Sequence, residues 1–188
     1  MPYSLTDTLL YFFIYSFCGW LMETILCSVQ ERRFINRGFL NGPLCPIYGC
    51  GVTLIMIFLL PVRDGLSNLA IALPVVFIAG AGLASAVEFI TSWLMEKLFH
   101  ARWWDYSHYK YNLGGYVCIP FSALWGVGAA LTLRFIHPLI HMVISRVPAL
   151  AGQIILIAGL VILAMDFISV LGVVFQVQKY NTRVEELA

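Results

Sequence analysis

Three acidic residues lie inside long apolar stretches of the sequence, namely Glu23, Glu88 and Asp166. A charged acid at the centre of a bilayer costs about 2.5–3.5 kcal/mol on insertion scales, so an intramembrane acid is a candidate binding residue by default. The alternative is a structural acid that is neutral or hydrogen-bonded to a neighbouring helix. Substrate or ion binding and the structural role are equally compatible with Glu23 and Glu88, whereas the structural role is favoured for Asp166.

Two glycine- and proline-rich segments each lead into an apolar stretch: NRGFLNGPLCPIYGCG (residues 36–51) and YNLGGYVCIPFSALWGVG (residues 111–128). Glycine permits close approach of the backbone, and proline lacks the donor that a helix interior needs. A helix that starts in this way presents free N–H groups and the positive end of its dipole. The residues expected to form these helix entries are Gly42, Pro43, Cys45, Pro46, Tyr48, Gly49, Gly115, Cys118 and Pro120.

We therefore predict a polar pocket open to the cytoplasm, with Glu23 and Glu88 in its walls and two helix N-termini at its floor. Non-helical backbone at membrane depth is tolerated where it lines such a cavity. The polar side chains expected at the mouth are Asn36, Arg37, Asn41, Arg102 and Asn112. The alternative is a pair of tight turns at the membrane interface with no cavity between them.

The composition indicates which elements position these residues. Of the 188 residues, 61% are hydrophobic and 11% are charged, and the mean hydropathy is +0.87, whereas a soluble domain is about 45–50% apolar and about 25% charged. Helices and closed barrels alone satisfy the backbone in lipid, and these apolar runs have helix length. The first run lacks a basic region before it and an A-x-A site after it, so we expect a span and not a cleaved signal.

We thus predict an all-α membrane protein, with residues 1–188 forming a single integral membrane domain. The five expected transmembrane helices are Thr6–Val29, Pro46–Leu60, Leu69–Met95, Tyr116–Ile136 and Leu150–Val177.

Loop charges set the expected orientation. With five spans, the first loop, the third loop and the C-terminal tail share one side and carry eight of the eleven Lys and Arg residues, while Arg63, Arg134 and Arg146 lie on the other. We expect a multi-pass protein of the cell membrane, and the positive-inside rule then places its N-terminus outside the cell and its C-terminus in the cytoplasm. Aromatic residues of the third loop are expected to form an interfacial belt: Trp103, Trp104, Tyr106, Tyr109 and Tyr111.

The chain also contains a weak internal repeat. When YGCGVTLIMIFLLP (residues 48–61) is placed over WGVGAALTLRFIHP (residues 125–138), five of fourteen positions match, including Gly49 with Gly126 and Gly51 with Gly128. Each half has a helix with one glutamate, a basic loop and a glycine-rich helix entry. We predict two parallel two-helix repeats, about residues 6–61 and 69–138, and an additional helix over residues 150–177.

Motifs for soluble catalysis, for a P-loop and for nucleic-acid binding are missing from the sequence, and the net charge is +1. The five cysteines are odd in number and include no C-x-x-C, so we expect neither a disulfide framework nor a zinc site. His137 and His141 share a helical face without a third ligand and are expected at the outer interface. No metal, no cofactor and no nucleic-acid partner is expected.

Several motifs together resemble the CmpB-like family of ABC-transporter type IV membrane proteins. They are GWLMET (residues 19–24), the segment 36–51, EFITSWLMEKLFHARWWDYS (residues 88–107) and NLGGYVC (residues 112–118). The resemblance covers roughly residues 10–130 and implies a permease, without a role for any one residue. The matching residues are Gly19, Trp20, Glu23, Asn36, Gly38, Gly42, Pro43, Cys45, Pro46, Tyr48, Gly49, Glu88, Trp104, Asp105 and Asn112.

A transport component is the favoured function. Five helices are few for a complete transporter, so we expect a homo-oligomer or a partner subunit in the lipid bilayer. An ABC-type system would require a separate ATPase on the cytoplasmic loops, with the basic third loop as docking surface. The first alternative is a non-catalytic assembly or regulatory factor in which polar groups fix helix packing. A membrane enzyme acting on a lipid or amphiphile is less favoured, with Cys45 or Cys118 as candidate nucleophile.

Overall fold

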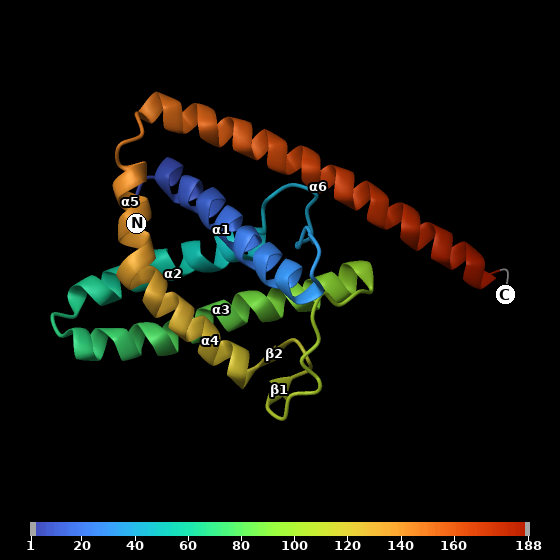
Figure 1. Cartoon of the computed structure of the whole chain (residues 1–188), viewed down its shortest axis with the longest axis horizontal. Helices are drawn as coiled ribbons and strands as arrows, with labels where there is room; N and C mark the ends of the chain where they lie inside the picture. Colours follow the sequence, from blue (N-terminus) through green and yellow to red (C-terminus); the bar gives the residue numbers. More distant parts are fainter. Residues whose placement is uncertain (1–2, 187–188) are drawn as a thin grey trace.

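The computed structural model describes the chain from residue 3 to residue 186 and is mainly helical (Figure 1). The helices are α1 (Leu5–Glu31), α2 (Pro46–Gly65), α3 (Leu69–Phe99), α4 (Ile119–Leu131), the π-helical turn η1 (Thr132–Ile136), α5 (His137–Ile144) and α6 (Ala149–Glu186). Before α4, the two-residue strands β1 (Asn112–Leu113) and β2 (Val117–Cys118) form an antiparallel hairpin.

The five predicted transmembrane helices are confirmed as helices that are long and apolar enough to cross a bilayer. The apolar helical stretches are Leu5–Glu31, Pro46–Gly65, Leu69–Phe99, Ile119–Ile144 and Ala149–Val177. The fourth consists of α4, η1 and α5 in one continuous rod. It begins at Ile119, three residues later than expected from the sequence, because residues 117 and 118 belong to the hairpin.

Local sequence explains where the helices begin and end. Ser4 caps α1 by accepting a hydrogen bond from the Asp7 amide, and Asn68 caps α3 in the same way from Ala70. Proline lies in the first turn of α2 and of α4, where its missing N–H costs nothing. The helices α1 and α3 both end at a residue with positive φ, Arg32 and His100.

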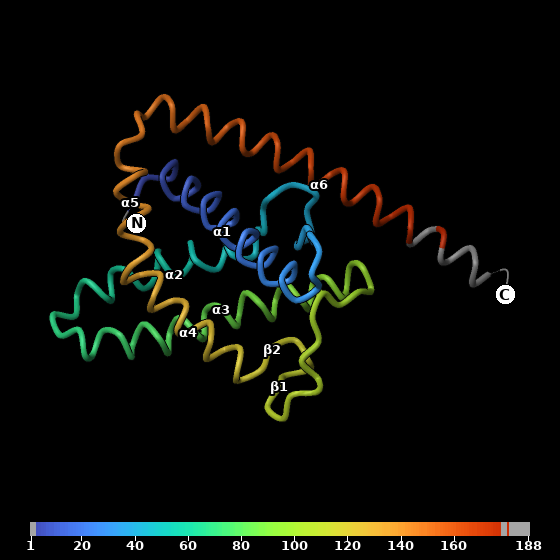
Figure 2. The backbone as a smooth tube through the Cα atoms, in the orientation of Figure 1, coloured from blue at the N-terminus to red at the C-terminus, as the bar shows by residue number. Residues whose placement is uncertain are grey.

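Figure 2 shows that α1, α3 and α6 run toward the same end of the molecule, while α2 and α4 return. We call this end, which carries residues 32–45 and 100–118, the loop end, and the opposite end, which carries Ser4 and residues 66–68, the N-terminal end. Consecutive helices from α1 to α4 pack against one another, whereas α6 contacts mainly α1. The buried core lies between α1, α2, α3 and the α4–α5 rod: Leu10, Tyr11, Tyr15, Ile55, Met56, Leu59, Leu60, Val76, Ala129, Leu133 and Ile144.

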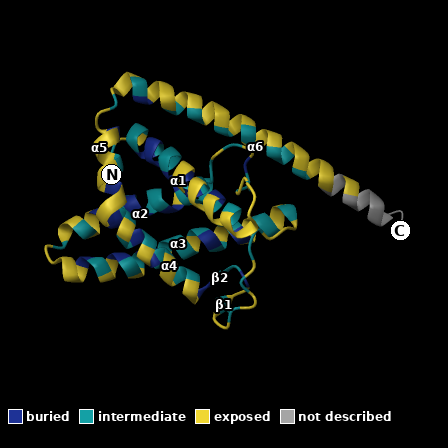
Figure 3. Ribbon diagram, in the orientation of Figure 1, coloured by how far each residue is buried: buried dark blue, intermediate teal, exposed yellow. Residues whose placement is uncertain are grey.

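The outer surface of the bundle is apolar, as expected for a protein surrounded by lipid. Exposed residues cover most of α6 and the outward faces of the other helices (Figure 3). Large aliphatic side chains are among them, such as Ile78, Ile162 and Ile168. In water such a surface would aggregate, whereas in a bilayer it contacts acyl chains.

Candidate functional site

Glu88 lies near the loop end of α3 and is almost completely buried, with 5% of its surface exposed. Two aromatic donors bind its carboxylate. The Tyr106 hydroxyl donates to Oε1 at 2.9 Å, and the Trp125 indole N–H donates to Oε2 at 3.0 Å. Tyr106 belongs to the loop before the hairpin and Trp125 to α4, so this acid joins three parts of the chain.

Glu23 lies toward the loop end of α1 and retains contact with the surface. Its side chain is 29% exposed, and its Oε1 accepts a hydrogen bond from the Tyr48 hydroxyl in the first turn of α2. The Arg37 Nε lies 4.0 Å from its Oε2. Glu23 is thus paired with a donor from α2 and faces one cation of the first loop.

The partners of the two glutamates contact each other. The rings of Tyr48 and Trp125 pack edge to face, with centroids 5.7 Å apart. Glu23, Tyr48, Trp125 and Glu88 therefore form a continuous series of contacts, which we call the Glu–aromatic chain. The structure brings the two predicted glutamates to one site, and it places two aromatic rings between them.

Glycine on α1 and α2 makes this arrangement possible. A Cβ at Gly19 would lie 2.3 Å from the Tyr48 ring, and a Cβ at Gly49 would lie 2.1 Å from the Ser16 Oγ. The first helix entry is also fixed by its backbone, because the Cys45 N–H donates to the Ser16 carbonyl at 3.0 Å. Because of these close approaches the Tyr48 ring packs directly against Gly19. Its hydroxyl can therefore reach Glu23, which lies one turn further along α1.

The helix pairs α1–α2 and α3–α4 share one glycine contact. A Cβ at Gly49 would lie 2.6 Å from the Phe12 carbonyl oxygen, and a Cβ at Gly126 would lie 2.7 Å from that of Phe77. Phe12 stands eleven residues before Glu23, and Phe77 stands eleven residues before Glu88. The equivalent aromatic positions Tyr48 and Trp125 each directly precede these glycines and each bind the glutamate of their own pair.

The first-loop residues predicted at the mouth of the pocket form hydrogen bonds within the loop and to α1. Asn36 accepts from the Trp20 indole at 2.6 Å and donates to the Asn41 carbonyl at 2.8 Å. The Arg37 amide donates to the Thr24 hydroxyl at 3.3 Å. These bonds fold the first loop back over the end of α1, close to Glu23.

Asp166 of α6 binds the same loop and not the glutamates. Its carboxylate accepts from the Asn41 amide at 3.2 Å, from the Asn41 side chain at 2.9 Å and from the Gly42 amide at 2.8 Å. These contacts agree with the structural role that the sequence favours for this acid.

Arg102 and Asn112 stabilise the third loop. Arg102 lies 3.0 Å from a Glu96 oxygen and 4.8 Å from the centre of the Tyr116 ring. Asn112 donates to the Tyr109 carbonyl at 2.7 Å and accepts from the Gly115 amide at 2.9 Å. A Cβ at Gly115, which has a φ of +77°, would lie 2.6 Å from an Asp105 oxygen.

The third loop presents Tyr106 to Glu88. Hydrogen bonds from Ser107 hold the pKa of the neighbouring Asp105 carboxyl below its usual value. Burial, and then the Glu88 carboxylate, raise the pKa of Tyr106, so its hydroxyl keeps its proton and acts as a donor.

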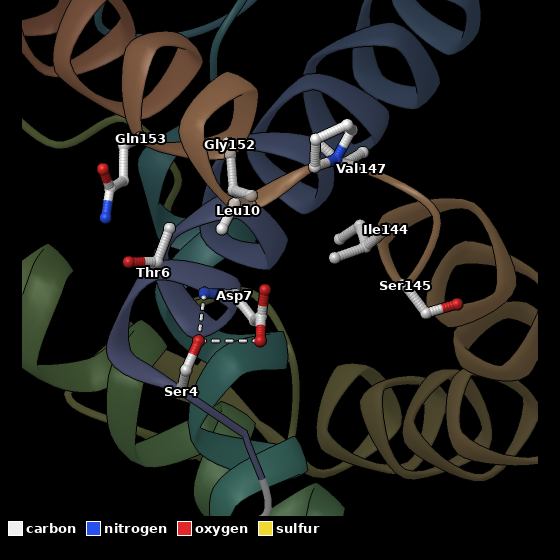
Figure 4. A pocket seen from close by; sticks show the side chains of 11 residues that line it. Ser4, Thr6, Asp7, Leu10, Ile144, Ser145, Val147, Gly152 and Gln153 are labelled. Carbon is white, nitrogen blue, oxygen red and sulfur yellow. Dashed lines mark hydrogen bonds between the residues drawn. The ribbon is translucent and has the colours of Figure 1, made fainter.

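The two described cavities lie at the N-terminal end, away from the glutamates. One, of about 310 Å³, is enclosed by the first turn of α1, the end of α5 and the start of α6, where Ser4, Asp7 and Gln153 supply polar groups (Figure 4). The other, of about 340 Å³, is lined by Arg63, Ser67, Arg134 and four apolar residues. Among the side chains that the structure describes, no group of three or more His, Cys, Asp or Glu residues could hold a metal ion.

A family model described as "Putative ABC-transporter type IV" matches residues 10–171. The chain belongs to this family. The match confirms the family resemblance found in the sequence motifs and extends it through η1, α5 and the first part of α6. It includes all four residues of the Glu–aromatic chain and Asp166. No curated protein and no solved structure is significantly similar to the chain.

In this member of the family, sequence reasoning missed three residues of the site. The Tyr106 hydroxyl donates a hydrogen bond to Glu88, whereas the sequence predicts this residue only as part of an interfacial aromatic belt. Trp125 matches Tyr48 in the internal alignment, which was the signal that it could occupy an equivalent position. Trp20 stands beside Gly19 in the GWLMET motif, yet its bond to Asn36 could not be read from the sequence.

Proposed function

We propose that this protein is the membrane-spanning component of a transport system and that the Glu–aromatic chain is its polar site, facing the cytoplasm. The observation that carries the proposal is the pair of intramembrane carboxylates, each bound by an aromatic side chain from the first turns of the next helix. Placing two acids among apolar helices is costly, and membrane proteins retain such groups mainly on pathways for ions or polar solutes. The family description supports the same class.

The two carboxylates suit a solute that donates hydrogen bonds or carries positive charge. Glu23 is the accessible acid, since its side chain is partly exposed and its nearest cation is 4.0 Å away. Glu88 is the enclosed acid, and both of its oxygens already have a donor. Binding would therefore begin at Glu23 and reach Glu88 when the Tyr48–Trp125 contact opens. This step would alter the packing of α2 against α4.

A partner supplies the energy in this proposal. The third loop carries cations and exposed side chains, and a separate ATPase would dock on it; Lys110 and Tyr111 are both exposed there. A homo-oligomer in the bilayer is the other arrangement that we propose for a chain of five helices.

Ligand-dependent stabilisation tests the site. The purified protein is heated with a panel of metal cations, organic amines and amino acids, and the unfolding temperature is recorded. We expect at least one member to stabilise the wild type, with the effect lost in Glu23→Gln and Glu88→Gln and kept in the control Glu31→Gln, which alters an exposed acid at the end of α1.

The stabilising compound is then tested for movement into liposomes that contain the protein, with and without a co-purified ATPase. If the Gln variants bound and moved every compound as the wild type does, the proposed site would be wrong.

A non-catalytic assembly factor is the second candidate. It is favoured by the complete hydrogen bonding of Glu88 within the chain, which a purely structural acid also requires. In that case we expect Glu23→Gln and Glu88→Gln to lower the unfolding temperature, with no ligand-dependent stabilisation and no uptake into liposomes in the wild type for them to lose.

Enzymatic chemistry at a cysteine has less support. Burial, and then Glu23, raise the pKa of the Cys45 thiol to about 12, so at neutral pH it is not the thiolate that a nucleophile needs. Cys118 is buried, with 2% of its surface exposed.

A further inference from the structure

Three tyrosines and two histidines meet at the N-terminal half of the bundle, and we call them the Tyr–His cluster. The Tyr3 hydroxyl lies 2.8 Å from Nε2 of His137, and the Tyr15 hydroxyl lies 3.1 Å from Nδ1 of the same ring. The Tyr11 hydroxyl lies 2.6 Å from Nδ1 of His141. His137 thus has a hydroxyl on each ring nitrogen while only 2% of it is exposed.

The helices are built to bring these rings together. His137 and His141 are four residues apart on one face of α5, as Tyr11 and Tyr15 are on α1. The π-helical turn η1 precedes them, and the His137 amide donates to the Thr132 carbonyl five residues back. Such turns are rare and often occur at functional sites. Here the turn directly precedes the buried histidine.

The polar side chains continue along α1 toward the loop end. Tyr11, Tyr15, Gly19 and Glu23 recur at intervals of four residues and therefore share one face of the helix, with the Tyr48 ring lying over Gly19. Tyr15 and Glu23 are eight residues apart, about 12 Å along the axis, which is too far for a direct hydrogen bond.

Two buried hydroxyls without a partner lie near the Tyr15 end of this interval, Ser16 on α1 and Thr53 on α2 one turn closer to the N-terminal end than Gly49. Ser16 is fully buried, and its Oγ has no hydrogen-bond partner among the described residues. Thr53 on α2 is partly buried as a residue, but its Oγ1 is buried and likewise has no partner. Ser16 packs against Gly49, and Thr53 follows Gly49 by one helical turn on the same face. A buried hydroxyl left unpaired costs about 1–3 kcal/mol, and in proteins such groups are commonly satisfied by internal water.

We propose that the α1–α2 interface is a proton path, in which water bound at Ser16 and Thr53 connects the Tyr–His cluster to Tyr48 and Glu23. The path goes beyond the proposed transport function, because it names the proton as a species that crosses the membrane whatever solute binds. Its two ends reach the surface at His141, which is exposed one turn before α5 ends, and at Glu23.

The transfer steps balance without an oxidant or reductant. A neutral imidazole accepts a proton on its free ring nitrogen and releases the proton of the other nitrogen to the next hydroxyl. Each hydroxyl or water accepts one proton and donates another, and the Glu23 carboxylate takes up the last proton and releases it at the loop end. The charged or titratable groups that face the cluster are Arg63 and Asp64 at the end of α2, Asp7 on α1, and Cys18 near Tyr15.

Proton flux into liposomes tests the path. The full chain is reconstituted with a pH-sensitive dye inside, and a potassium gradient with valinomycin sets the membrane potential. We expect proton entry above that of protein-free liposomes, and a loss of about tenfold or more in Tyr15→Phe and in Ser16→Ala, since a positioned proton-transfer group contributes at least that factor. Both substitutions remove a hydroxyl while keeping the surrounding packing.

The matched control is Tyr180→Phe, which removes the hydroxyl of an exposed tyrosine near the end of α6 and should leave the flux unchanged. Proton entry no faster than in protein-free liposomes, or unchanged in both path variants, would overturn the path. The ligand-dependent stabilisation described above is measured on the same variants. If the solute site exists but the proton path does not, Tyr15→Phe and Ser16→Ala keep the ligand-dependent stabilisation while no proton flux is found. Failure of the proton path is therefore distinguishable from failure of the proposed solute site.

Discussion

Glu23 and Glu88 are both intramembrane acids, but they differ in how their oxygens are satisfied. Both oxygens of Glu88 accept hydrogen bonds from fixed aromatic donors, whereas Glu23 has one aromatic donor and a partly exposed side chain. The sequence predicted both acids, because a carboxylate in an apolar run is conspicuous. It could not predict the donors of Glu88, since Tyr106 and Trp125 reach it from 18 and 37 residues away.

We expect Glu88→Gln to destabilise the protein more than Glu23→Gln. The amide NH₂ of a glutamine at position 88 would face one of two N–H or O–H donors, leaving that donor unpaired in the interior at a cost of about 1–3 kcal/mol. At position 23 the side chain can turn toward the surface. Thermal unfolding in detergent, followed by tryptophan fluorescence, measures the difference, and Glu31→Gln is the control. Equal losses at positions 23 and 88 would contradict this explanation.

Helix packing depends on a few glycines, and here the two helix pairs can be compared directly. The sequence predicted the helices well, because hydropathy and proline entries mark them clearly. It did not predict η1, where the hydrogen-bond pattern changes within a helical stretch, or the hairpin before α4, whose strands have two residues each. The repeat stays a prediction, and the shared glycine contacts support it.

Gly49→Ala and Gly126→Ala should both destabilise the bundle, by about 1–3 kcal/mol each, because a new methyl group would meet a backbone carbonyl of the facing helix. The controls are Gly51→Ala and Gly128→Ala, the next matched pair, where a Cβ has no atom within 4 Å. These should be neutral or slightly stabilising. Unfolding temperatures of the four variants settle the comparison. Loss of stability at all four positions would indicate that helix flexibility, and not close packing, explains the glycines.

At the scale of the whole molecule, α6 is attached at few points. About ten residues into α6 Gly159 packs on the Phe13 ring, and two turns further Asp166 binds Asn41 and Gly42 of the first loop. The rest of α6 is largely exposed (Figure 3). Hydropathy predicts such a helix, but not which bundle face it contacts, because lipid and protein offer it similar apolar surroundings.

Asp166→Ala should loosen the first loop and the adjoining part of α6. A hydrogen bond to a charged group contributes about 1.5–3 kcal/mol, so the Gly42 amide should exchange its hydrogen about tenfold faster or more. Hydrogen exchange read by mass spectrometry measures this change. Gln153→Ala, at the opposite end of α6, serves as control and should leave exchange in the first loop as it is. An unchanged Gly42 exchange rate in Asp166→Ala would show that other contacts hold the loop.

The orientation of the molecule in the membrane decides which compartment the Glu–aromatic chain faces. An odd number of spans puts the termini on opposite sides, and eight of the eleven Lys and Arg residues lie at the loop end or in the part of α6 that follows its apolar span. The positive-inside rule therefore predicts a cytoplasmic loop end. Ser67, in the turn between α2 and α3, and His108, in the third loop, are exposed at the two opposite ends.

In a chain whose five native cysteines are replaced by serine or alanine, we expect Ser67→Cys to react with a membrane-impermeant thiol reagent in intact cells. His108→Cys should react after the membrane is permeabilised and not before. The cysteine-free chain controls for background labelling. The reverse labelling pattern would place Glu23 and the third loop outside the cell, where an ATPase has no access to cytoplasmic ATP. It would therefore contradict the ABC-type arrangement in the proposed function. The proton path would then be tested with the opposite direction of flux.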